Sequence, residues 1–449
     1  MAPDNLIAGA DDAPALIQAA SHTTVSHGEL RRLVAERRSW SDHYKSKLVF
    51  IGVEPTIDCI VDLLALFASG ATTAFLNPAI PPEVVNQWIQ SYHPQLIVGL
   101  GEELLEGDPA LEFQRKVAPT DAVLLPTSGS TGNPKFVRLS STNVVANAKQ
   151  IASALSISPS HRALGHLPLF YSYGLSVLTS HLIAGASVVL TKASAVQPEF
   201  WHAMERYEVS SLPGVPYHYE MYKRMKLTER DLPALKDVTQ AGGRLNDARI
   251  EEFHTSLAAR GIRMWVMYGQ TEATARITVM PHDELGGRIG SVGYSVPDGE
   301  IKILDADAEG VGEVQYSGPN VMLGYSESRD DLNTGDSTDQ VLLTGDLGRL
   351  DSDGRLWIVG RTKRIAKVFG TRVNLDDVEQ KLDALGVPLA ATSGDDIIKV
   401  FVESREVIDG FARQCERVLG FSPGSIKVEY VGHLPLTAAG KVAYQELPS

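Results

Sequence analysis

The sequence is poor in cysteine and in positive charge. Its 449 residues include 2 cysteines, Cys59 and Cys415, which stand far apart and lack metal-ligand spacing. This usage excludes a disulfide framework and favours a reducing, cytoplasmic compartment. The formal net charge of −14 disfavours a nucleic-acid partner, which would need clustered lysine and arginine. A nucleotide requires only a local cationic site, so this class of ligand stays open.

A secretory leader and a long hydrophobic run are also absent. The N-terminus has no basic segment followed by an apolar stretch, as a signal peptide would. The most apolar region, residues 59–76, is interrupted by Asp62, and its helical part ends at Gly70. We therefore expect a buried helix and strand there rather than a membrane span, and no membrane partner.

What the chain does have is an alternation of strand-like and helix-like patterns. Short apolar runs predict strands at 47–53, 72–76 and 95–100, and apolar residues at helical spacing predict helices over 57–68 and 81–92. This rhythm is typical of an α/β fold with a parallel or mixed sheet. Such a length predicts more than one domain.

The pattern changes near Gly299, where strands with glycine and aspartate turns predict a smaller β region. The last stretch has its own rhythm, with helices expected over 374–385 and 406–419 between short strands. It reads as a compact α+β unit. We accordingly divide the chain into an N-terminal domain, 1–360, and a C-terminal domain, 361–449.

Between two apolar strands lies the segment "LLPTSGSTGNPKFVRLS", residues 124–140. It offers hydroxyl donors, glycines that permit close approach to a ligand, and one ammonium group, a combination that can cradle phosphate. A Walker A loop would run from Gly-Lys-Ser/Thr directly into a helix, whereas here Pro134 precedes Lys135 and a strand follows. Ser141 or Thr142 is then expected to cap a helix. The predicted phosphate-binding residues are Thr127, Ser128, Gly129, Ser130, Thr131, Gly132 and Lys135.

This segment and four others, in the same order, resemble the motifs of the adenylate-forming (AMP-binding) superfamily of acyl-CoA synthetases, peptide-synthetase adenylation domains and luciferases. The other four are "YGQTEA" at 268–273, "TGDLGRLDSDGRLWIVGR" at 344–361, "KVFGTRVNLDDVE" at 367–379 and "LPLTAAGKV" at 434–442. The resemblance covers nearly the whole chain. It implies a large N-terminal domain of layered sheets and helices with a β-barrel-like region, and a small mobile α+β C-terminal domain.

The resemblance also implies a reaction in two halves. A carboxylic acid attacks the α-phosphorus of ATP and releases pyrophosphate, and the acyl group of the resulting acyl-AMP passes to a thiol. Lys441 resembles the lysine that reaches the substrate carboxylate and the α-phosphate. Thr271 would bind the α-phosphate, and Glu272 would hold Mg²⁺, for which one carboxylate beside phosphates and waters suffices.

The remaining motif residues are assigned by the same resemblance. Tyr268 would lie against adenine, Asp346 would accept hydrogen bonds from both ribose hydroxyls, and Arg361 would assist it. Lys363 would be the hinge about which the C-terminal domain alternates between the two half-reactions, and Gly370 would line the path of the thiol. The expected nucleotide-binding residues further include Gly242, Gly243, Arg244, Gly269 and Gln270.

The acid is only partly defined. Where peptide-synthetase relatives place an aspartate for an amino group, this chain has Tyr171, which disfavours an α-amino acid because its ammonium would lack a partner. Tyr171, Tyr173, Val215 and Gly242 are expected to line the pocket of an aryl, short or medium acyl acid. Core positions remain an alternative for both tyrosines.

Three functions stay open for this sequence. The expected product is an acyl-CoA, from ATP, Mg²⁺ and CoA. The N-terminal region looks short beside many relatives, which keeps open acyl transfer to the phosphopantetheine of a carrier protein acting in trans, or amide formation. A non-catalytic nucleotide- or acyl-binding protein is the alternative of another class, and the joint presence of Lys441, Glu272 and Asp346 argues against it.

Overall fold

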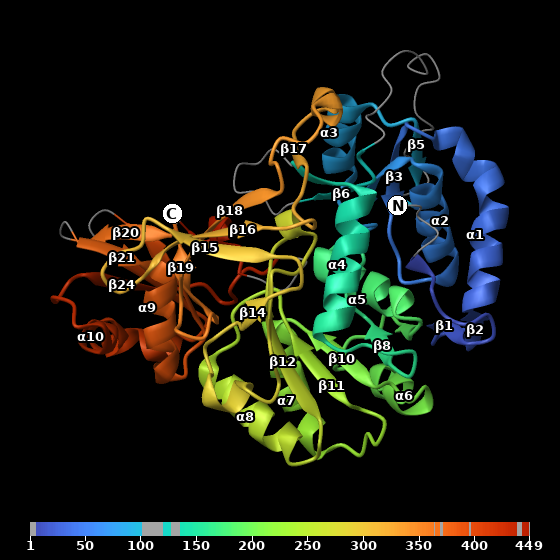
Figure 1. The fold of residues 1–449 in the computed structure, drawn as a ribbon. Helices are drawn as coiled ribbons and strands as arrows, with labels where there is room; N and C mark the ends of the chain where they lie inside the picture. The colour runs from blue at the N-terminus through green and yellow to red at the C-terminus, as the bar shows by residue number, and fades with distance from the viewer. Residues whose placement is uncertain are drawn as a thin grey trace.

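The computed structural model describes residues 6–100, 120–126, 135–362, 364–368, 371–394, 397–437 and 442–448. Two mixed sheets form the larger part of the chain (Figure 1). The first has nine strands in the order β14 (Tyr294–Ser295), β13 (Thr278–Met280), β12 (Arg263–Tyr268), β11 (Asp237–Gln240), β10 (Ser211–Gly214), β8 (Arg162–Gly165), β9 (Ser187–Leu190), β1 (Pro14–Gln18) and β2 (Thr23–Ser26). The second has six, in the order β17 (Gly324–Ser326), β7 (Phe136–Leu139), β6 (Val123–Pro126), β4 (Thr72–Leu76), β3 (Leu48–Gly52) and β5 (Leu96–Val98).

Helices cover both faces of these sheets because strand residues are apolar on both sides. On β12, Trp265 and Met267 join a core shared by the two sheets, whereas Met264 and Val266 join a separate core on the other face, as the period of two dictates. The shared core contains α2 (Ile57–Ser69), α4 (Ser141–Ala154) and α5 (Ser172–Ile183), with α1 (His27–Ser41) packed on α2. The outer faces carry α6 (Pro198–Arg206), α7 (Pro216–Arg224), α8 (Asp247–Ala258) and, on the six-stranded sheet, α3 (Pro82–Tyr92).

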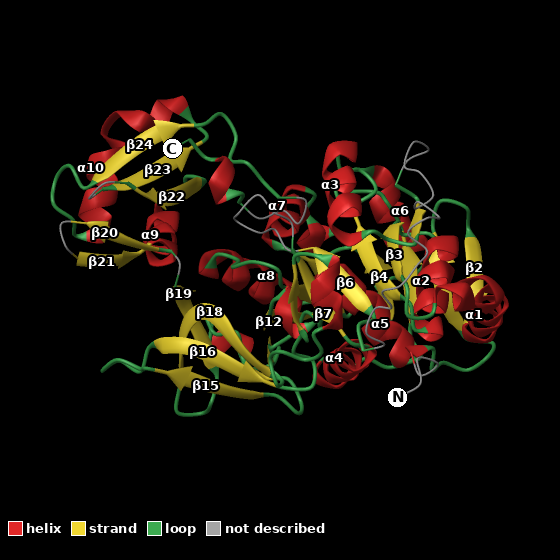
Figure 2. Cartoon of the chain, turned by 90° about the horizontal axis from the view of Figure 1, so that it is seen from above, coloured by secondary structure: helices red, strands yellow, loops and turns green. Residues whose placement is uncertain are grey.

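The C-terminal third is built from smaller sheets. An antiparallel sheet of β15 (Glu300–Leu304), β16 (Gly312–Ser317), β18 (Val341–Leu350) and β19 (Leu356–Arg361) leads into the last unit. That unit has a core of its own and lies at one end of the molecule in Figure 2. It comprises β20 (Ile365–Val368), β21 (Thr371–Asn374), α9 (Leu375–Leu382), β22 (Leu389–Ser393), β23 (Ile398–Val402), α10 (Ile408–Leu419) and β24 (Ile426–Tyr430). The predicted α/β class, with a large and a small part, is confirmed.

One local prediction is wrong. We expected Ser141 or Thr142 to cap the helix after β7, but the cap is Ser140. Its backbone is extended, its hydroxyl accepts the Asn143 N–H at 3.1 Å, and the Asn143 side chain accepts the Ser140 N–H at 2.8 Å. The reciprocal pair satisfies two donors at once, which a single hydroxyl one residue later cannot do.

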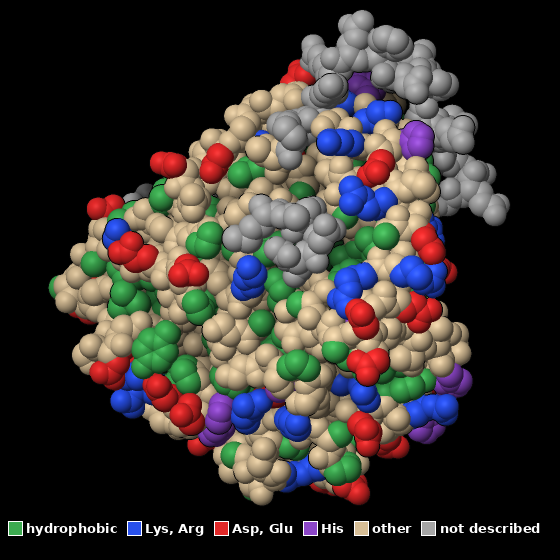
Figure 3. Space-filling view, turned by 45° about the vertical axis from the view of Figure 1, so that its right-hand side comes forward, with side chains coloured by type: hydrophobic (Ala, Val, Ile, Leu, Met, Phe, Trp, Pro, Cys, Tyr) green, Lys and Arg blue, Asp and Glu red, His purple; other side chains and the backbone are tan. Residues whose placement is uncertain are grey.

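Charged side chains of both signs are interspersed over the face of the molecule shown in Figure 3, with hydrophobic groups scattered between them. Within the described residues, none of the helices combines the length and apolar character needed to cross a bilayer.

A buried ion pair helps to anchor the turn at Thr334 and Gly335 to β7, the strand beside the predicted phosphate loop. Arg138 on β7 is 1% exposed and donates from Nε and Nη2 to Asp121, both at 3.2 Å. Its remaining donors reach the Thr334 hydroxyl at 2.6 Å and the Gly335 carbonyl at 2.7 Å. The guanidinium therefore joins segments about 200 residues apart.

We expect Arg138→Met to lower the free energy of unfolding by about 3–5 kcal/mol, because it leaves the Asp121 carboxylate buried without its partner. Urea denaturation measures the change. Arg138→Met combined with Asp121→Leu should recover part of the loss, since no unpaired charge then remains. An unchanged stability of the single variant would show that the pair does not hold these segments together.

Candidate active site

Tyr268, the last residue of β12, and the turn that follows it, residues 269–277, bring several of the predicted site residues together. The turn begins at Gly269, where an added Cβ would lie 1.9 Å from the Ala275 carbonyl oxygen, so only glycine permits this chain path. A short 3-10 helix, Thr271–Ala273, follows. The turn thus presents consecutive side chains from a tightly fixed backbone.

The side chain that precedes the turn meets the predicted ribose site. The hydroxyl of Tyr268 donates to Asp346 on β18, and Arg361 on β19 lies 3.3 Å from the other oxygen of that carboxylate. Asp346 and Arg361 are partners across β18 and β19, so the sheet register itself sets their contact. Burial and the Asp346 charge raise the pKa of Tyr268, which keeps the phenol a donor.

The next residues of the turn contact a helix and a strand. The Gln270 amide donates to the Thr344 carbonyl at 3.2 Å. The hydroxyl oxygens of Thr271 and Ser172 are 3.2 Å apart, and Ser172 is the first residue of α5. Because a helix N-terminus presents free N–H groups, this arrangement places hydroxyl and backbone donors side by side.

Glu272 is joined to Lys135 through a residue that the sequence analysis did not identify. Tyr325 on β17 donates its hydroxyl to a Glu272 carboxylate oxygen at 2.7 Å, and the Lys135 ammonium lies 3.7 Å from the centre of its ring. Tyr325 pairs with Val137 across β17 and β7, which makes Lys135 its diagonal neighbour on the same face. Tyr325 thus contacts the Lys135 ammonium through its ring and the Glu272 carboxylate through its hydroxyl.

Two of the predicted acyl-pocket residues, Tyr171 and Val215, meet at Gly242. This glycine has φ +80°, and an added Cβ would lie 2.6 Å from the Tyr171 hydroxyl and 2.9 Å from Val215. Burial raises the pKa of Tyr171 to about 12. Tyr173 is 3% exposed and its hydroxyl donates to the Thr239 carbonyl at 3.1 Å, so its ring is part of the core.

Other predicted residues lie apart or fall outside the described part of the chain. Gly243 packs near Pro216, and Arg244 pairs with Asp247 at 3.5 Å, where its charge also reaches Asp383 of the last unit. The phosphate-loop residues Thr127, Ser128, Gly129, Ser130, Thr131 and Gly132, together with Lys363, Gly370 and Lys441, lie outside the described residues.

Lys135, Glu272 and Asp346 belong to the motifs that resemble those of the adenylate-forming class, and the structure gives each of them a tyrosine partner. The model of the AMP-binding enzyme family matches residues 6–326, and the chain belongs to this family. The predicted family is therefore confirmed.

Three similar curated proteins are CoA ligases. The 2-succinylbenzoate–CoA ligase of Enterococcus faecalis is 24% identical over 413 residues, 85% of this chain and 84% of that protein. The 4-coumarate–CoA ligase 5 of Oryza sativa is 27% identical over 495 aligned residues, 97% and 91% of the two chains. The sulfoacetate–CoA ligase of Cupriavidus necator is 30% identical over 340 residues, 72% and 65%. The expected enzyme class, an AMP-forming acid–thiol ligase, is confirmed by the family and these relatives.

The fold has close matches among solved structures. The o-succinylbenzoate CoA synthetase of Bacillus subtilis, in complex with AMP, aligns with a TM-score of 0.82 at 22% identity and covers 100% of this chain and 98% of its own. The expected architecture therefore extends over both the large and the small part.

Tyr325→Phe is expected to keep the ring under Lys135 but to remove the hydrogen bond to Glu272. A carboxylate released from its tyrosine is less well positioned, so we expect the Mg²⁺ concentration for half-maximal pyrophosphate release to rise several-fold, with a smaller change in the KM for ATP. A Mg²⁺ titration at saturating ATP measures this effect. Tyr430→Phe, at another exposed tyrosine, is the matched control, and an unchanged Mg²⁺ dependence would contradict the positioning role.

Proposed function

We propose that the protein activates a carboxylic acid with ATP and transfers the acyl group to CoA. The observation that carries this proposal is the convergence of Thr271, Glu272 and Lys135 beside the Asp346 pair, within a chain of the AMP-binding family. These groups supply donors, a cation and a metal-binding acid at one place. Charge that builds on phosphate oxygens is stabilised by such preorganised groups.

In the first half-reaction, a carboxylate oxygen of the substrate forms a bond to the α-phosphorus of ATP. The bond from that phosphorus to the β-phosphate bridging oxygen breaks, and pyrophosphate leaves with its electron pair. Thr271 donates to the α-phosphate, and the phosphate loop through Lys135 binds the β- and γ-phosphates. In the second half, the thiol sulfur bonds to the acyl carbon, AMP leaves as the anion, and the thiol proton passes to solvent.

Glu272 fits a magnesium ion by its chemistry. One carboxylate with a hydrogen-bonded oxygen leaves a second oxygen for the ion, and Mg²⁺ in nucleotide sites is commonly held by one or two carboxylates plus phosphates. Glu272 would hold the ion, which would supply positive charge to neutralise the phosphates. Tyr325 keeps the Glu272 carboxylate oriented, and Lys135 adds a second cation beside it.

The C-terminal domain, 361–449, alternates between two orientations about Lys363. In the first, Lys441 approaches the substrate carboxylate and the α-phosphate, and in the second Gly370 lines the path of the thiol. Separate hydrophobic cores support this division, because the cluster within 366–426 shares no residue with the clusters of the larger part. A hinge of few residues can carry such motion. The two cysteines are unpaired, in keeping with a cytoplasmic location.

The identity of the acid must be sought in the pocket, because relatives differ in it. Their names include indoleacetate, oxalate, sulfoacetate and 4-coumarate. Tyr171, Tyr173 and Val215, with Gly242, form the wall against which the acyl group packs. The absence of a carboxylate at Tyr171 disfavours an amino acid.

A panel of carboxylic acids tests the function. With ATP and Mg²⁺, at least one acid should give pyrophosphate release that depends on enzyme and acid, and added CoA should give a thioester detectable by mass spectrometry. If acyl-AMP forms but only a holo-carrier protein or an amine accepts the acyl group, the acceptor is wrong while adenylation stands. No pyrophosphate exchange with any acid would identify a binding protein instead.

Lys441→Ala is expected to reduce the rate of adenylation by roughly 10²–10³-fold, because a donor to developing charge is lost. Thioester formation from supplied acyl-AMP should stay within a few-fold of the unchanged enzyme. Separate assays of the two half-reactions measure both effects, with Lys427→Ala as a control on the same domain. Equal losses in both half-reactions would argue against this role for Lys441.

A further inference from the structure

Arg276 is a buried cation that stacks on an aromatic ring but has no carboxylate partner among the described residues. The residue is 2% exposed, and its Nε has no hydrogen-bond partner. Among the described residues, the hydrogen bonds and ion pairs include none from its guanidinium to a carboxylate or carbonyl. Burial lowers the pKa of Arg276, and the neighbouring Tyr173 and Tyr171 partly counteract this. A guanidinium stays protonated under such conditions, so a full positive charge is buried here.

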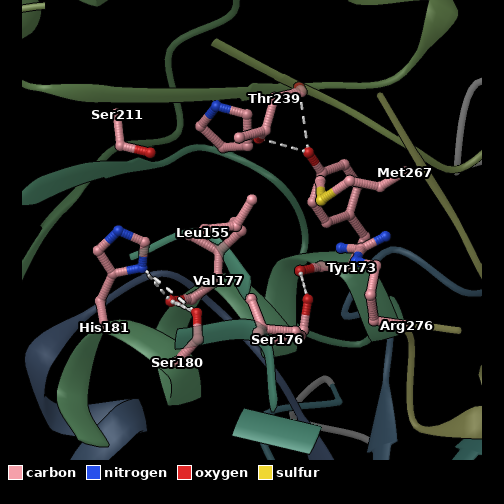
Figure 4. A pocket seen from close by; sticks show the side chains of 12 residues that line it. Leu155, Tyr173, Ser176, Val177, Ser180, His181, Ser211, Thr239, Met267 and Arg276 are labelled. Atoms are coloured by element: carbon pink, nitrogen blue, oxygen red, sulfur yellow. Dashed lines mark hydrogen bonds between the residues drawn. The ribbon is translucent and has the colours of Figure 1, made fainter. Parts of the chain in front are cut away.

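The guanidinium lines an interior cavity between α4, α5 and the nine-stranded sheet. Figure 4 shows it rising toward the ring of Tyr173, with Thr239 and Met267 on the sheet side. The cavity measures about 20 Å³, which is room for about one water molecule. The Arg276 guanidinium carbon lies 4.8 Å from the centre of the Tyr173 ring. A contact with a ring does not use the N–H groups as hydrogen-bond donors to oxygen, and Nε accordingly has no acceptor among the described residues.

The backbone of Arg276 is held firmly. Its carbonyl accepts one amide donor from Asn147 at 3.1 Å and one from Asn320 at 2.9 Å. Asn320 also donates to the Ala273 carbonyl at 2.8 Å. The side chain thus starts from a fixed point, as a specific binding group requires.

The position also lies on the course that an acyl group would take. Tyr171 is the N-cap residue of α5, and its hydroxyl lies close to Gly242. The positive charge of Arg276 acts to lower the pKa of Tyr171. The next residue, Ser172, contacts Thr271 at the reaction centre. The first turn of α5 therefore runs from the reacting end of the substrate to the buried guanidinium.

We propose that Arg276 receives a second acidic group at the far end of the substrate, so that the acid activated here is a dianion such as a dicarboxylate. The inference rests on the proposed function and names its substrate class. A carboxylate would accept charge-assisted hydrogen bonds from the guanidinium N–H groups. It would also pair a positive charge that has no carboxylate partner among the described residues. Because the cavity has room for about one water molecule, the proposal requires the Tyr171 ring to move away from Gly242 when such an acid binds.

Matched acids of equal carbon number, one ending in a methyl group and the other in a carboxylate, test this inference in the unchanged enzyme. We expect kcat/KM for pyrophosphate release to favour the diacid by at least about tenfold at the chain length that fits, because a charge-assisted hydrogen bond to a buried group discriminates by that order. This comparison requires no variant and no assumption about folding.

Arg276→Met and Arg276→Lys extend the test, with Arg288→Met, an exposed arginine on a nearby loop, as the matched control. Arg276→Met should lower kcat/KM for the diacid by tenfold or more and leave the monoacid unchanged or improved, whereas Arg276→Lys should retain part of the preference. A thermal shift by the diacid in the unchanged protein, absent in Arg276→Met, provides a readout besides activity.

The results of these experiments distinguish a failure of the Arg276 role from a failure of the proposed ligase activity. Pyrophosphate release with monoacids as good as or better than diacids, or an equal loss for both in Arg276→Met, would overturn the role of Arg276 while the ligase stands. Failure of every acid to release pyrophosphate would overturn the proposed function and this inference with it.

Discussion

The structure of the site depends on one close backbone contact, between Gly269 and Ala275 in the turn after β12. This contact folds the turn on itself, and Asn320 then fixes its second half by donating to the carbonyls of Ala273 and Arg276. Thr274 adopts φ +59° and Ala275 φ +133° there, conformations that L residues avoid and that a surrounding structure must enforce. As a result, four side chains each contact a different partner. Tyr268 contacts Asp346, Gln270 contacts Thr344, Thr271 contacts Ser172 and Glu272 contacts Tyr325.

Those partners come from elements far apart in the chain, and the turn brings them into one site. Tyr268 reaches Asp346 on the antiparallel sheet, Glu272 reaches Tyr325 on the edge of the six-stranded sheet, and Arg276 enters the core beside α5. One backbone segment thereby fixes the residues that we propose for the ribose, the metal and the acyl group. A change in the Asn320 contacts would be felt at all three, since rigid elements transmit small shifts.

Local patterns predicted the fold class and the family, but they could not supply the pairs between distant segments. The strands and helices of residues 47–100 follow from apolar periodicity alone, because each needs only its own side-chain pattern. The helix expected over 406–419 is instead broken at Gly410, which takes φ +83°, a conformation that glycine allows but periodicity does not reveal. Tyr325 lies in no recognised motif, and only the β17–β7 register shows that it faces Lys135.

Arg276 is a second feature that local patterns could not predict, because a sequence does not distinguish a solvated arginine from a buried one. Its burial follows from the strained turn, and its lack of a carboxylate follows from the neutral residues that α4 and α5 place around it. A protein that needed only to fill this space would be more stable with an apolar side chain there, because a buried unpaired charge is costly. An anion bound beside the Arg276 guanidinium would offset this unfavourable free energy. This is why we propose that an acidic group of the substrate binds there.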